Sequence, residues 1–347
     1  MTLSTRSRRA IERIDQICRS ASSTLGLRVA LLEQFRAAIR FDHHVWLLTD
    51  PRTTVGASPL ASVPVASALP NLIRLKYATP TNRWTALAER RPPVALLSDA
   101  ADGDPQSAPW RGMLRAVGVG DVMSAAFADR FGCWGFLDLW RAGAAPFGEE
   151  DRELLGSTAS AVTSALRAGQ ARTFAGPRDG GDLGPMVLLL DNDLNVVEQT
   201  SATDAWLRVL VPVAADRPAI PAAAYNVGAQ LLAVEGGIDD HGPSTRVHLA
   251  GGRWVTLRAA RTSGVRIAVT IEDTVPPDRL DMFARSHGFT PRETELLVHL
   301  AAGDDTREIA RRMVVSENTV QDHLKSLFEK TSARNRPALL SRALGTR

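Results

Sequence analysis

Residues 316–330 read SENTVQDHLKSLFEK, and this stretch decides how the C-terminal part of the chain folds. Ser316 is a residue type that caps the N-terminus of a helix, and apolar residues follow it at helical spacing. The stretch therefore predicts a helix with one buried and one polar face. The expected buried face is Val320, Leu324, Leu327 and Phe328, and the expected polar face is Asn318, Gln321, Asp322 and Lys325.

Two more helices are predicted directly before this one. Residues 290–293 read TPRE, a capping box with proline at the first helical position, and Gly303 ends the helix that begins there. Residues 305–308, DTRE, repeat the capping arrangement, and the small Ala310 permits a close helix crossing. Two helices joined by a short turn form a helix-turn-helix unit, whose second helix fits a DNA major groove about 12 Å wide.

Residues 289–343 resemble the LuxR-type (GerE/NarL-like) helix-turn-helix of bacterial regulators. The matching motifs are TPRE, LL, AAG, EIARRM, VSENTVQDHL and EK, in that order. The resemblance implies an all-α, four-helix DNA-binding domain at 285–347 that acts as a homodimer, with two recognition helices about one DNA turn apart and a palindromic site. The dimer seam in this family is the last helix, which here carries Leu339, Leu340, Ala343 and Leu344.

Eight residues of this domain are expected to bind DNA. Asn and Gln side chains can pair with adenine, Asp can accept from cytosine, and Lys suits guanine or phosphate. The family is often basic at the positions that match Gln321, Asp322 and Lys325, and this chain departs from that pattern, which leaves its DNA sequence open. The eight residues are Asn318, Gln321, Asp322 and Lys325 on bases, and Thr306, Thr319, Arg334 and Arg336 on phosphates.

Alternatives exist for the charged members of this set. Asp322 is interpreted as a specificity element that rejects wrong sites by repulsion. Its alternative is a surface pair with Lys325, three residues further along the helix. For Arg334 and Arg336 the alternative is a solvated side chain that contacts nothing.

The charge of the chain supports a nucleic-acid surface at its C-terminal end. Residues 306–347 hold nine Lys/Arg and four Asp/Glu, a net +5, whereas the whole chain carries a net +3. The rest of the sequence is therefore slightly acidic. A positive charge concentrated in one segment is typical of a surface that binds phosphates.

The upstream sequence predicts a multidomain α+β protein. Gly/Pro-rich segments at 171–185 and 274–280 divide the chain. Upstream of each of them, short apolar runs typical of strands occur together with segments whose apolar residues have helical spacing. By the order of its elements the first block resembles a GAF domain, and the second, with its Asp191-Asn192-Asp193 turn between strands, resembles a PAS domain. The expected divisions are an N-terminal helix at 1–20, a GAF-like sensor domain at 21–170, a PAS-like domain at 183–275 and the helix-turn-helix domain at 285–347.

Aromatic residues cluster in the first block. Five of the seven tryptophans fall within residues 41–140, together with Tyr77. Such a cluster can line an apolar ligand pocket, and the alternative is an ordinary core, because aromatic side chains supply much of any buried area. The pocket candidates are Trp46, Tyr77, Trp84 and Trp134.

Several classes of protein are not expected. No Gly-Lys pair occurs, which excludes a P-loop, and there is no GxSxG elbow. Cys18 and Cys133 are far apart, and the adjacent His43 and His44 would point to opposite faces of a strand, so no metal site or cofactor is expected. We therefore expect no enzyme activity.

The sequence thus predicts a cytoplasmic, sequence-specific transcriptional regulator with no membrane segment. Its expected partners are double-stranded DNA, a second copy of the chain, RNA polymerase and a small-molecule ligand of unknown identity. One alternative is a signalling adaptor that acts through protein contacts, independently of DNA. A sigma-factor-like promoter reader is the other, and the absence of further promoter-reading blocks upstream argues against it.

Overall fold

A computed structural model describes residues 4–100, 104–143, 145–175, 186–210, 219–249 and 253–345. The chain forms two compact units. The first comprises Met1–Leu166, Leu183–Val247 and Thr256–Glu272, and the second comprises Arg167–Asp182, His248–Val255 and Asp273–Arg347. Among the described residues, every helix is too short or too polar to cross a lipid bilayer.

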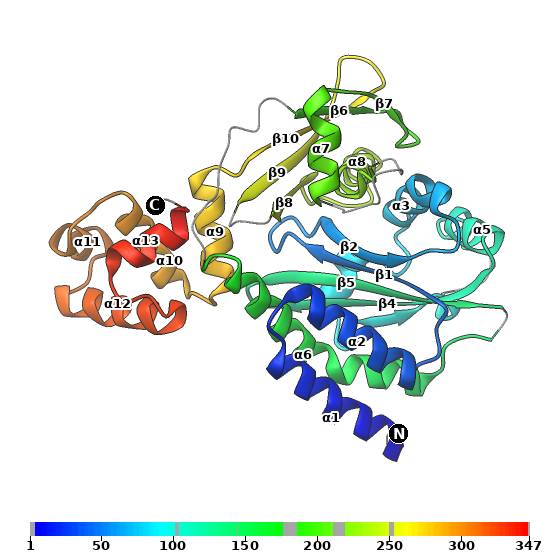
Figure 1. Ribbon diagram of the computed structural model, residues 1–347, viewed down its shortest axis with the longest axis horizontal. Coiled ribbons are helices and arrows are strands. Elements are labelled where there is room, and N and C mark those ends of the chain that lie inside the picture. The colour runs from blue at the N-terminus through cyan, green and yellow to red at the C-terminus, as the bar shows by residue number, and fades with distance from the viewer. Residues whose placement is uncertain are drawn as a thin grey trace. The chain divides into compact units, whose positions relative to one another are not determined.

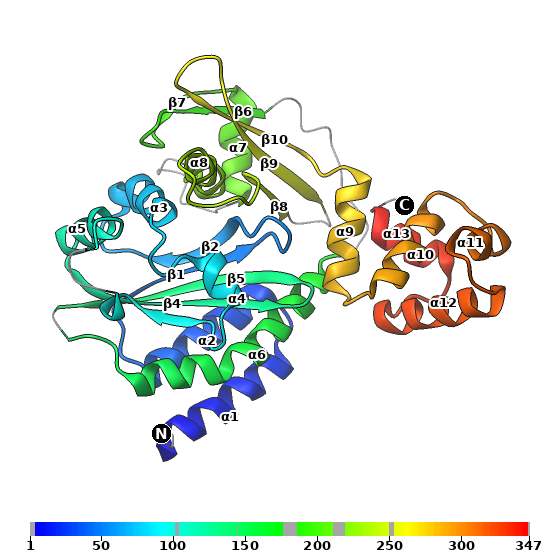
Figure 2. The same ribbon diagram turned by 180° about the vertical axis from the view of Figure 1, so that it is seen from behind.

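The first unit begins with a five-stranded antiparallel sheet in the order β2-β1-β5-β4-β3. Helices α1, α2 and α6 cover one face of it in both views (Figures 1 and 2). The strands are β1 (His43–Thr49), β2 (Gly56–Ser62), β3 (Val94–Leu96), β4 (Val119–Asp129) and β5 (Gly132–Ala142). The helices are α1 (Thr5–Ser20), α2 (Thr24–Ala38), α3 (Leu69–Ala78), α4 (Trp84–Glu89), α5 (Ala108–Ala116) and α6 (Glu149–Arg172), with short 3-10 turns at Ala66–Ala68 and Leu97–Asp99.

The two faces of this sheet bury different sets of side chains. Successive strand residues point to opposite faces, so Trp46 and its cross-strand neighbour Leu137 pack against the α1, α2 and α6 side. On the other face, Trp140 of β5 packs with Trp110 and Leu114 of α5. The predicted α+β class of this block is confirmed, with helices on both sides of one sheet.

A second five-stranded sheet, in the order β7-β6-β10-β9-β8, belongs to the first unit except for the strand ends His248, Trp254, Val255 and Asp273, which belong to the second. The turn between β6 and β7 is held by Asp191, whose Oδ1 accepts from the backbone N–H groups of Asp193 and Asn195. The strands are β6 (Met186–Leu190), β7 (Val196–Gln199), β8 (Ser244–His248), β9 (Trp254–Arg261) and β10 (Ile267–Asp273), and the helices are α7 (Ser201–Leu210) and α8 (Ala222–Glu235).

Two buried ion pairs join the segments that carry these sheets. Asp50 at the end of β1 binds Arg246 of β8, and Arg83 before α4 binds Asp239 after α8. In each pair both side chains are less than a tenth exposed. Because a buried charge is costly unless it is paired, these contacts tie the two sheets into one unit.

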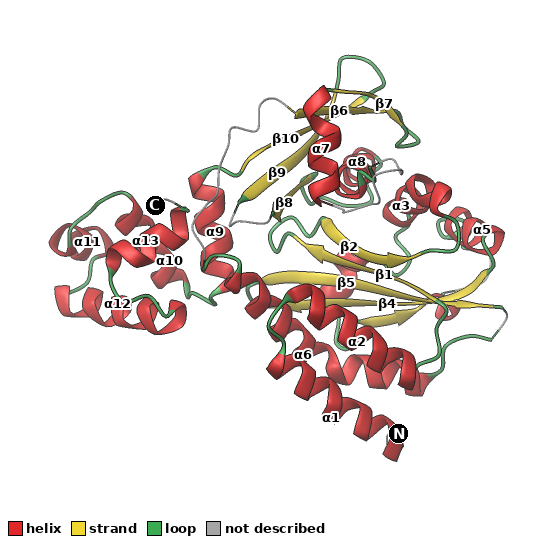
Figure 3. Cartoon of the chain, in the orientation of Figure 1, coloured by secondary structure: helices red, strands yellow, loops and turns green. Residues whose placement is uncertain are grey.

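The second unit ends in five consecutive helices, which stand out as the all-helical part of the chain (Figure 3). Their core also contains Phe174, which stacks on Trp254 at 5.1 Å between ring centroids and packs edge-on against Phe283. The helices are α9 (Pro276–Ser286), α10 (Pro291–Ala301), α11 (Thr306–Met313), α12 (Glu317–Thr331) and α13 (Arg336–Leu344).

The two segments interpreted from the sequence as linkers have different outcomes. Residues 176–185 of the first lie outside the described residues. In the second, Pro276 and Pro277 form the first turn of α9. Proline is compatible with that position because the first helical N–H groups have no intrahelical acceptor. Met282 and Phe283 of α9 are buried in the helical core, so this helix belongs to the C-terminal fold.

Candidate functional site

The helix-turn-helix consists of α11 and α12. Asp305 caps α11 by accepting from the Glu308 N–H, and Ser316 caps α12 by accepting from the Thr319 N–H. Between them Val314 adopts a left-handed conformation with φ 54°, and its side chain is 87% exposed. This conformation turns the chain within a few residues, and α11 and α12 then share one core, to which α11 contributes the buried Ala310 and α12 the buried Val320.

α12 has the two faces that the sequence predicts. Val320, Leu324 and Leu327 are buried, and Phe328 packs partly against the same core. No ion pair joins Asp322 to Lys325 in the part of the chain that the structure describes. Both side chains are therefore free to meet a partner of α12. The exposed residues of the opposite face are Asn318, Gln321, Asp322 and Lys325.

The other four candidate DNA contacts lie around this helix. Thr319 is half-buried at the first turn of α12, where its Oγ1 lies 2.9 Å from Ser316 Oγ. Arg336 at the start of α13 donates to Thr306 Oγ1 at the start of α11, at 2.6 Å. Arg334 is exposed. The Arg336–Thr306 bond holds one guanidinium at the N-terminus of α11.

A buried carboxylate fixes α12 to α10. Glu293 completes the capping box of α10, and its carboxylate also accepts from Ser326 Oγ at 2.6 Å and from Lys330 Nζ at 2.6 and 2.8 Å. Burial raises the pKa of Glu293, but the bonds from Lys330, Ser326 and the Thr290 N–H outweigh burial and lower it to about 2. From the sequence we expected only the capping role, because the contact with α12 spans 33 and 37 residues.

The carboxylate of Glu293 should make the free energy of unfolding of the helical unit depend on pH. Because its pKa falls from about 4.5 to about 2 on folding, its stabilisation is complete above pH 4.5 and is lost as the pH falls toward 2. We expect Glu293→Gln to cost about 1 kcal/mol at pH 6, from weakened hydrogen bonds, and progressively less at lower pH.

Denaturant unfolding of wild type and variant between pH 6 and 3 measures that difference. Glu295→Gln is the matched control, because Glu295 is 39% exposed and pairs only at the surface with Arg292 of the same helix, so its change should cost little at any pH. A cost of Glu293→Gln that stays constant across this range would contradict the assignment.

The last helix has less free apolar surface than the family resemblance implies. Leu339 and Ala343 are fully buried in the core of their own unit. Leu340 and Leu344 are only partly buried against it. The remaining apolar surface of α13 for a dimer seam is therefore centred on Leu340 and Leu344.

The first unit contains a cavity of about 1030 Å³ on the sheet face opposite α1, α2 and α6. Tyr77 and Trp84 line it, together with Trp110 and Trp140. Two of the expected pocket residues lie elsewhere. Trp46 points to the other face by strand alternation, and Trp134 lies where a bulge shifts the β4–β5 register. Both belong to the core beneath the helices.

A buried ion pair forms part of the cavity wall. Lys76 Nζ of α3 lies 3.2 Å from Asp138 Oδ2 of β5, and Trp84 Nε1 donates to Asp138 Oδ1 at 2.8 Å. Lys76 also donates to Ser124 Oγ at 3.1 Å. Burial lowers the pKa of Lys76, and the charge of Asp138 opposes that shift. The pair is neutral in sum and has its hydrogen bonds satisfied.

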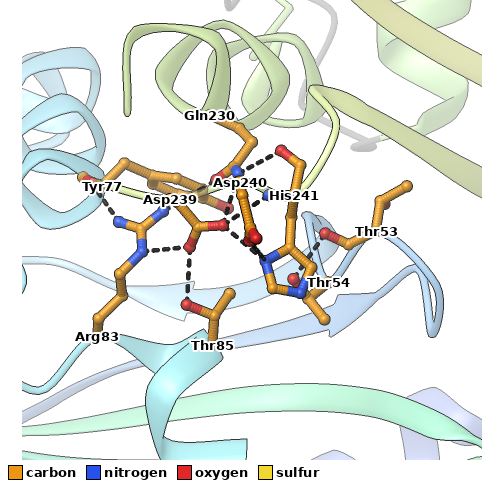
Figure 4. Close-up of polar contacts among 9 residues, drawn as sticks. All are labelled: Thr53, Thr54, Tyr77, Arg83, Thr85, Gln230, Asp239, Asp240 and His241. Carbon is orange, nitrogen blue, oxygen red and sulfur yellow. Dashed lines mark hydrogen bonds and ion pairs between the residues drawn. The ribbon is translucent and has the colours of Figure 1, made fainter. Parts of the chain in front are cut away.

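A second polar cluster surrounds Asp239 (Figure 4). Its Oδ2 accepts from Arg83 Nε and Thr85 Oγ1, and its Oδ1 accepts from the N–H and Nδ1 of His241 and from Gln230 Nε2. The hydrogen bond that His241 donates to Asp239 raises the pKa of His241.

The same cluster has the residue types of a metal site. Carboxylate and imidazole atoms of Asp239, Asp240 and His241 lie within 4.8 Å of one another. Both oxygens of Asp239 are already engaged, so a cation would have to displace Arg83 or His241. The cluster is therefore a hydrogen-bond network that joins the segments of the two sheets, and we assign no metal to it.

Comparison with known proteins identifies two parts of the chain. Residues 287–343 match the family model for bacterial regulatory proteins of the luxR family, and residues 9–166 match the model for the GAF domain. Over 52 residues the chain is 46% identical to a probable csgAB operon transcriptional regulatory protein of Salmonella typhimurium, covering 15% of this chain and 24% of that protein. Over 63 residues it is 30% identical to the transcriptional regulatory protein DesR of Bacillus subtilis, covering 18% and 32%.

The chain spans only 24% to 32% of the length of these relatives. The solved structure of Escherichia coli SdiA aligns over 98% of this chain and 97% of its own, with a TM-score of 0.33 and 13% identity. A likeness that low establishes no common arrangement. The two family matches identify the first and the last domain: the chain contains a GAF domain at residues 9–166 and a helix-turn-helix domain of the luxR family at residues 287–343.

Proposed function

We propose that this protein is a transcriptional regulator whose α12 reads the DNA major groove under the control of the upstream sensor domains. One observation carries the proposal. In a domain that matches the luxR family, the face of α12 opposite the buried Val320 and Leu324 is polar and exposed. Among the described residues, no ion pair joins Asp322 to Lys325 on this face. A helix whose inner face is fixed and whose outer face has donors and acceptors matches the requirements of base recognition.

The residues of this face have distinct proposed roles. Asn318 and Gln321 would pair with adenine, Asp322 would accept from cytosine N4, and Lys325 would contact guanine or phosphate. Thr306, Thr319, Arg334 and Arg336 would contact phosphates and set the register. The bond from Arg336 to Thr306 supports this role, because it presents a guanidinium beside the first turn of α11.

Dimerisation is a further part of the proposal. Two copies joined through Leu340 and Leu344 of α13 would present two α12 helices to successive major grooves. The operator would then be a palindrome. RNA polymerase would be a partner of the bound dimer, as for regulators that act at promoters.

The upstream unit would act as the sensor. The second sheet would be a PAS-like domain, and its order of a strand, an Asp191 turn, a second strand, helices and three closing strands supports this assignment. In the GAF domain, the cavity lined by Tyr77 and Trp84 would bind a small-molecule ligand.

The proposal is tested by selecting DNA from a random pool with the full-length chain at two salt concentrations. The full chain is needed because the helical core includes Phe174 and Trp254, which lie outside residues 285–347. We expect a palindromic sequence to be enriched, with affinity that falls steeply as salt rises. Failure to enrich any sequence, together with a salt-insensitive protein partner, would support the adaptor function instead.

A further inference from the structure

The first unit contains a second cavity, of about 700 Å³, which shares no lining residue with the larger one. Its wall comes from α1, α2, β5 and α6 and from the loops that adjoin them. Four arginines line this cavity, and they exceed the acids of the lining by two positive charges. The arginines are Arg6, Arg36, Arg40 and Arg141, and the acids are Asp42 and Asp151.

This positive charge is a local feature of the cavity. The whole chain carries a net +3 and residues 306–347 carry +5, which leaves −2 for residues 1–305. The cavity is formed entirely by residues of that slightly acidic part. Several charges of one sign in a concave surface raise the local concentration of the opposite ion, so the cavity should attract anions.

Backbone carbonyl groups hold two of the arginines in place. Arg141 Nε donates to the backbone O of Arg40 at 2.8 Å, and Arg6 Nη2 donates to the backbone O of Ala37. A carbonyl oxygen orients a guanidinium but leaves its charge uncompensated. Among the described residues, Arg141 is the one member of the four with an ion-pair partner, Asp151 at 3.3 Å.

The other two arginines of the lining are not neutralised either. The guanidinium of Arg36 lies over the ring of Phe41, 4.6 Å from its centroid. The exposed side chain of Arg40 has no hydrogen bond or ion pair within the described ranges of the chain. Because like charges repel one another, an anion between these groups would be stabilised. Guanidinium groups bind phosphate oxygens through paired hydrogen bonds, so phosphate is the anion that they suit best.

We propose that this cavity binds a small phosphorylated molecule through a diphosphate group. Two linked phosphates present more oxygens and more charge to arginines from three elements and a loop than a single phosphate does. Phe41, the one aromatic side chain among the described lining residues, is buried beneath Arg36, so a nucleobase would find no free ring to stack on. This site is separate from the sensor cavity, and the inference does not depend on the proposed function.

Calorimetric titration of the full-length chain with inorganic pyrophosphate and with orthophosphate tests the proposal. We expect pyrophosphate to bind about tenfold more tightly, the equivalent of one further hydrogen bond to a charged group. Its affinity should fall as salt rises, because the arginines lie at a solvated surface. ADP, which carries the same diphosphate on a nucleoside, should bind no more tightly than pyrophosphate.

Two variants with opposite effects assign the site. Arg40→Gln should weaken pyrophosphate binding about fivefold, and Asp42→Asn should tighten it by about as much, since one removes a positive and the other a negative charge from the lining. An amide oxygen can replace the Asp42 carboxylate as acceptor of the Ala142 N–H. Arg13→Gln is the matched control, because it removes the same charge from an exposed position of α1 outside the lining. It should bind like the wild type.

Four results would overturn the proposal: no binding of pyrophosphate at low salt, equal affinities for pyrophosphate and orthophosphate, equal losses in Arg40→Gln and Arg13→Gln, or tighter binding of ADP than of pyrophosphate. The affinity of Arg40→Gln for the selected operator should equal that of the wild type. A loss there would assign the cavity to DNA instead. If an operator is selected and pyrophosphate does not bind, this inference is wrong and the regulator function stands.

Discussion

Replacing Asp50 with alanine is expected to lower the free energy of unfolding of the first unit by about 3–5 kcal/mol, because it leaves the Arg246 guanidinium buried without its counterion. Asp50 Oδ2 accepts from Arg246 Nε at 2.6 Å, and Oδ1 accepts from Nη2 at 2.8 Å. The carboxylate also accepts from the backbone N–H groups of Arg52 and Thr53. Burial raises the pKa of Asp50, and the bonds and charge of Arg246 outweigh burial and lower it.

Denaturant unfolding of the full chain measures this loss. The matched control is Asp193→Ala, which removes the partner of Arg74 from an ion pair of 3.5 Å whose acid is 71% exposed. Exposed pairs contribute less than about 1 kcal/mol, so this control should change little. The double variant Asp50→Asn with Arg246→Met should be less destabilised than Asp50→Ala, since no unpaired charge remains. Equal losses in the two alanine variants would contradict the role of burial.

The second large effect is expected on DNA. Lys325→Ala and Gln321→Ala should each weaken binding to the selected operator by about 1–3 kcal/mol, which is roughly 5–150-fold in affinity. Both side chains are exposed, so neither variant should change the unfolding transition. If Lys325 contacts phosphate, its loss should also reduce the salt slope by about one, whereas Gln321→Ala should leave that slope unchanged.

Fluorescence anisotropy titrations of labelled operator over a range of salt give both quantities. Arg292→Ala is the control, because it removes one positive charge from α10, where Arg292 pairs with Glu295 on the surface. It should bind the operator like the wild type. Full affinity in both the Lys325 and the Gln321 variant would show that this face of α12 does not read the bases.

The helical region could be predicted from the sequence because its signals are local. Thr290, Asp305 and Ser316 each cap a helix within three residues of their own position, and the structure has all three caps. The buried and exposed faces of α12 follow from helical periodicity alone. Beyond this local range the sequence failed to indicate the bond from Glu293 to Lys330, because it depends on how α10 and α12 pack.

The cavity could be predicted only in part. A cluster of aromatic residues indicated that the first domain has a large buried face, but composition cannot assign a side chain to one face of a sheet. Trp46 differs from its strand neighbours Val45 and Leu47, which line the cavity, by a single step along β1. The face to which Trp134 points depends on a bulge between β4 and β5, and the sequence contains no reliable signal for that bulge.

The bond between Asp50 and Arg246 has a consequence for how the protein is made. The two residues are 196 positions apart. At roughly 5–20 residues per second, a ribosome needs about 10–40 s to add that length of chain. During this interval the nascent GAF domain contains Asp50 without its ion-pair partner, the Arg246 guanidinium. Asp50 therefore stays in contact with water until β8 is available. The ion pair of Asp50 can form only after β8 has left the ribosome, so the GAF domain cannot reach its final state before most of the second sheet has been synthesised.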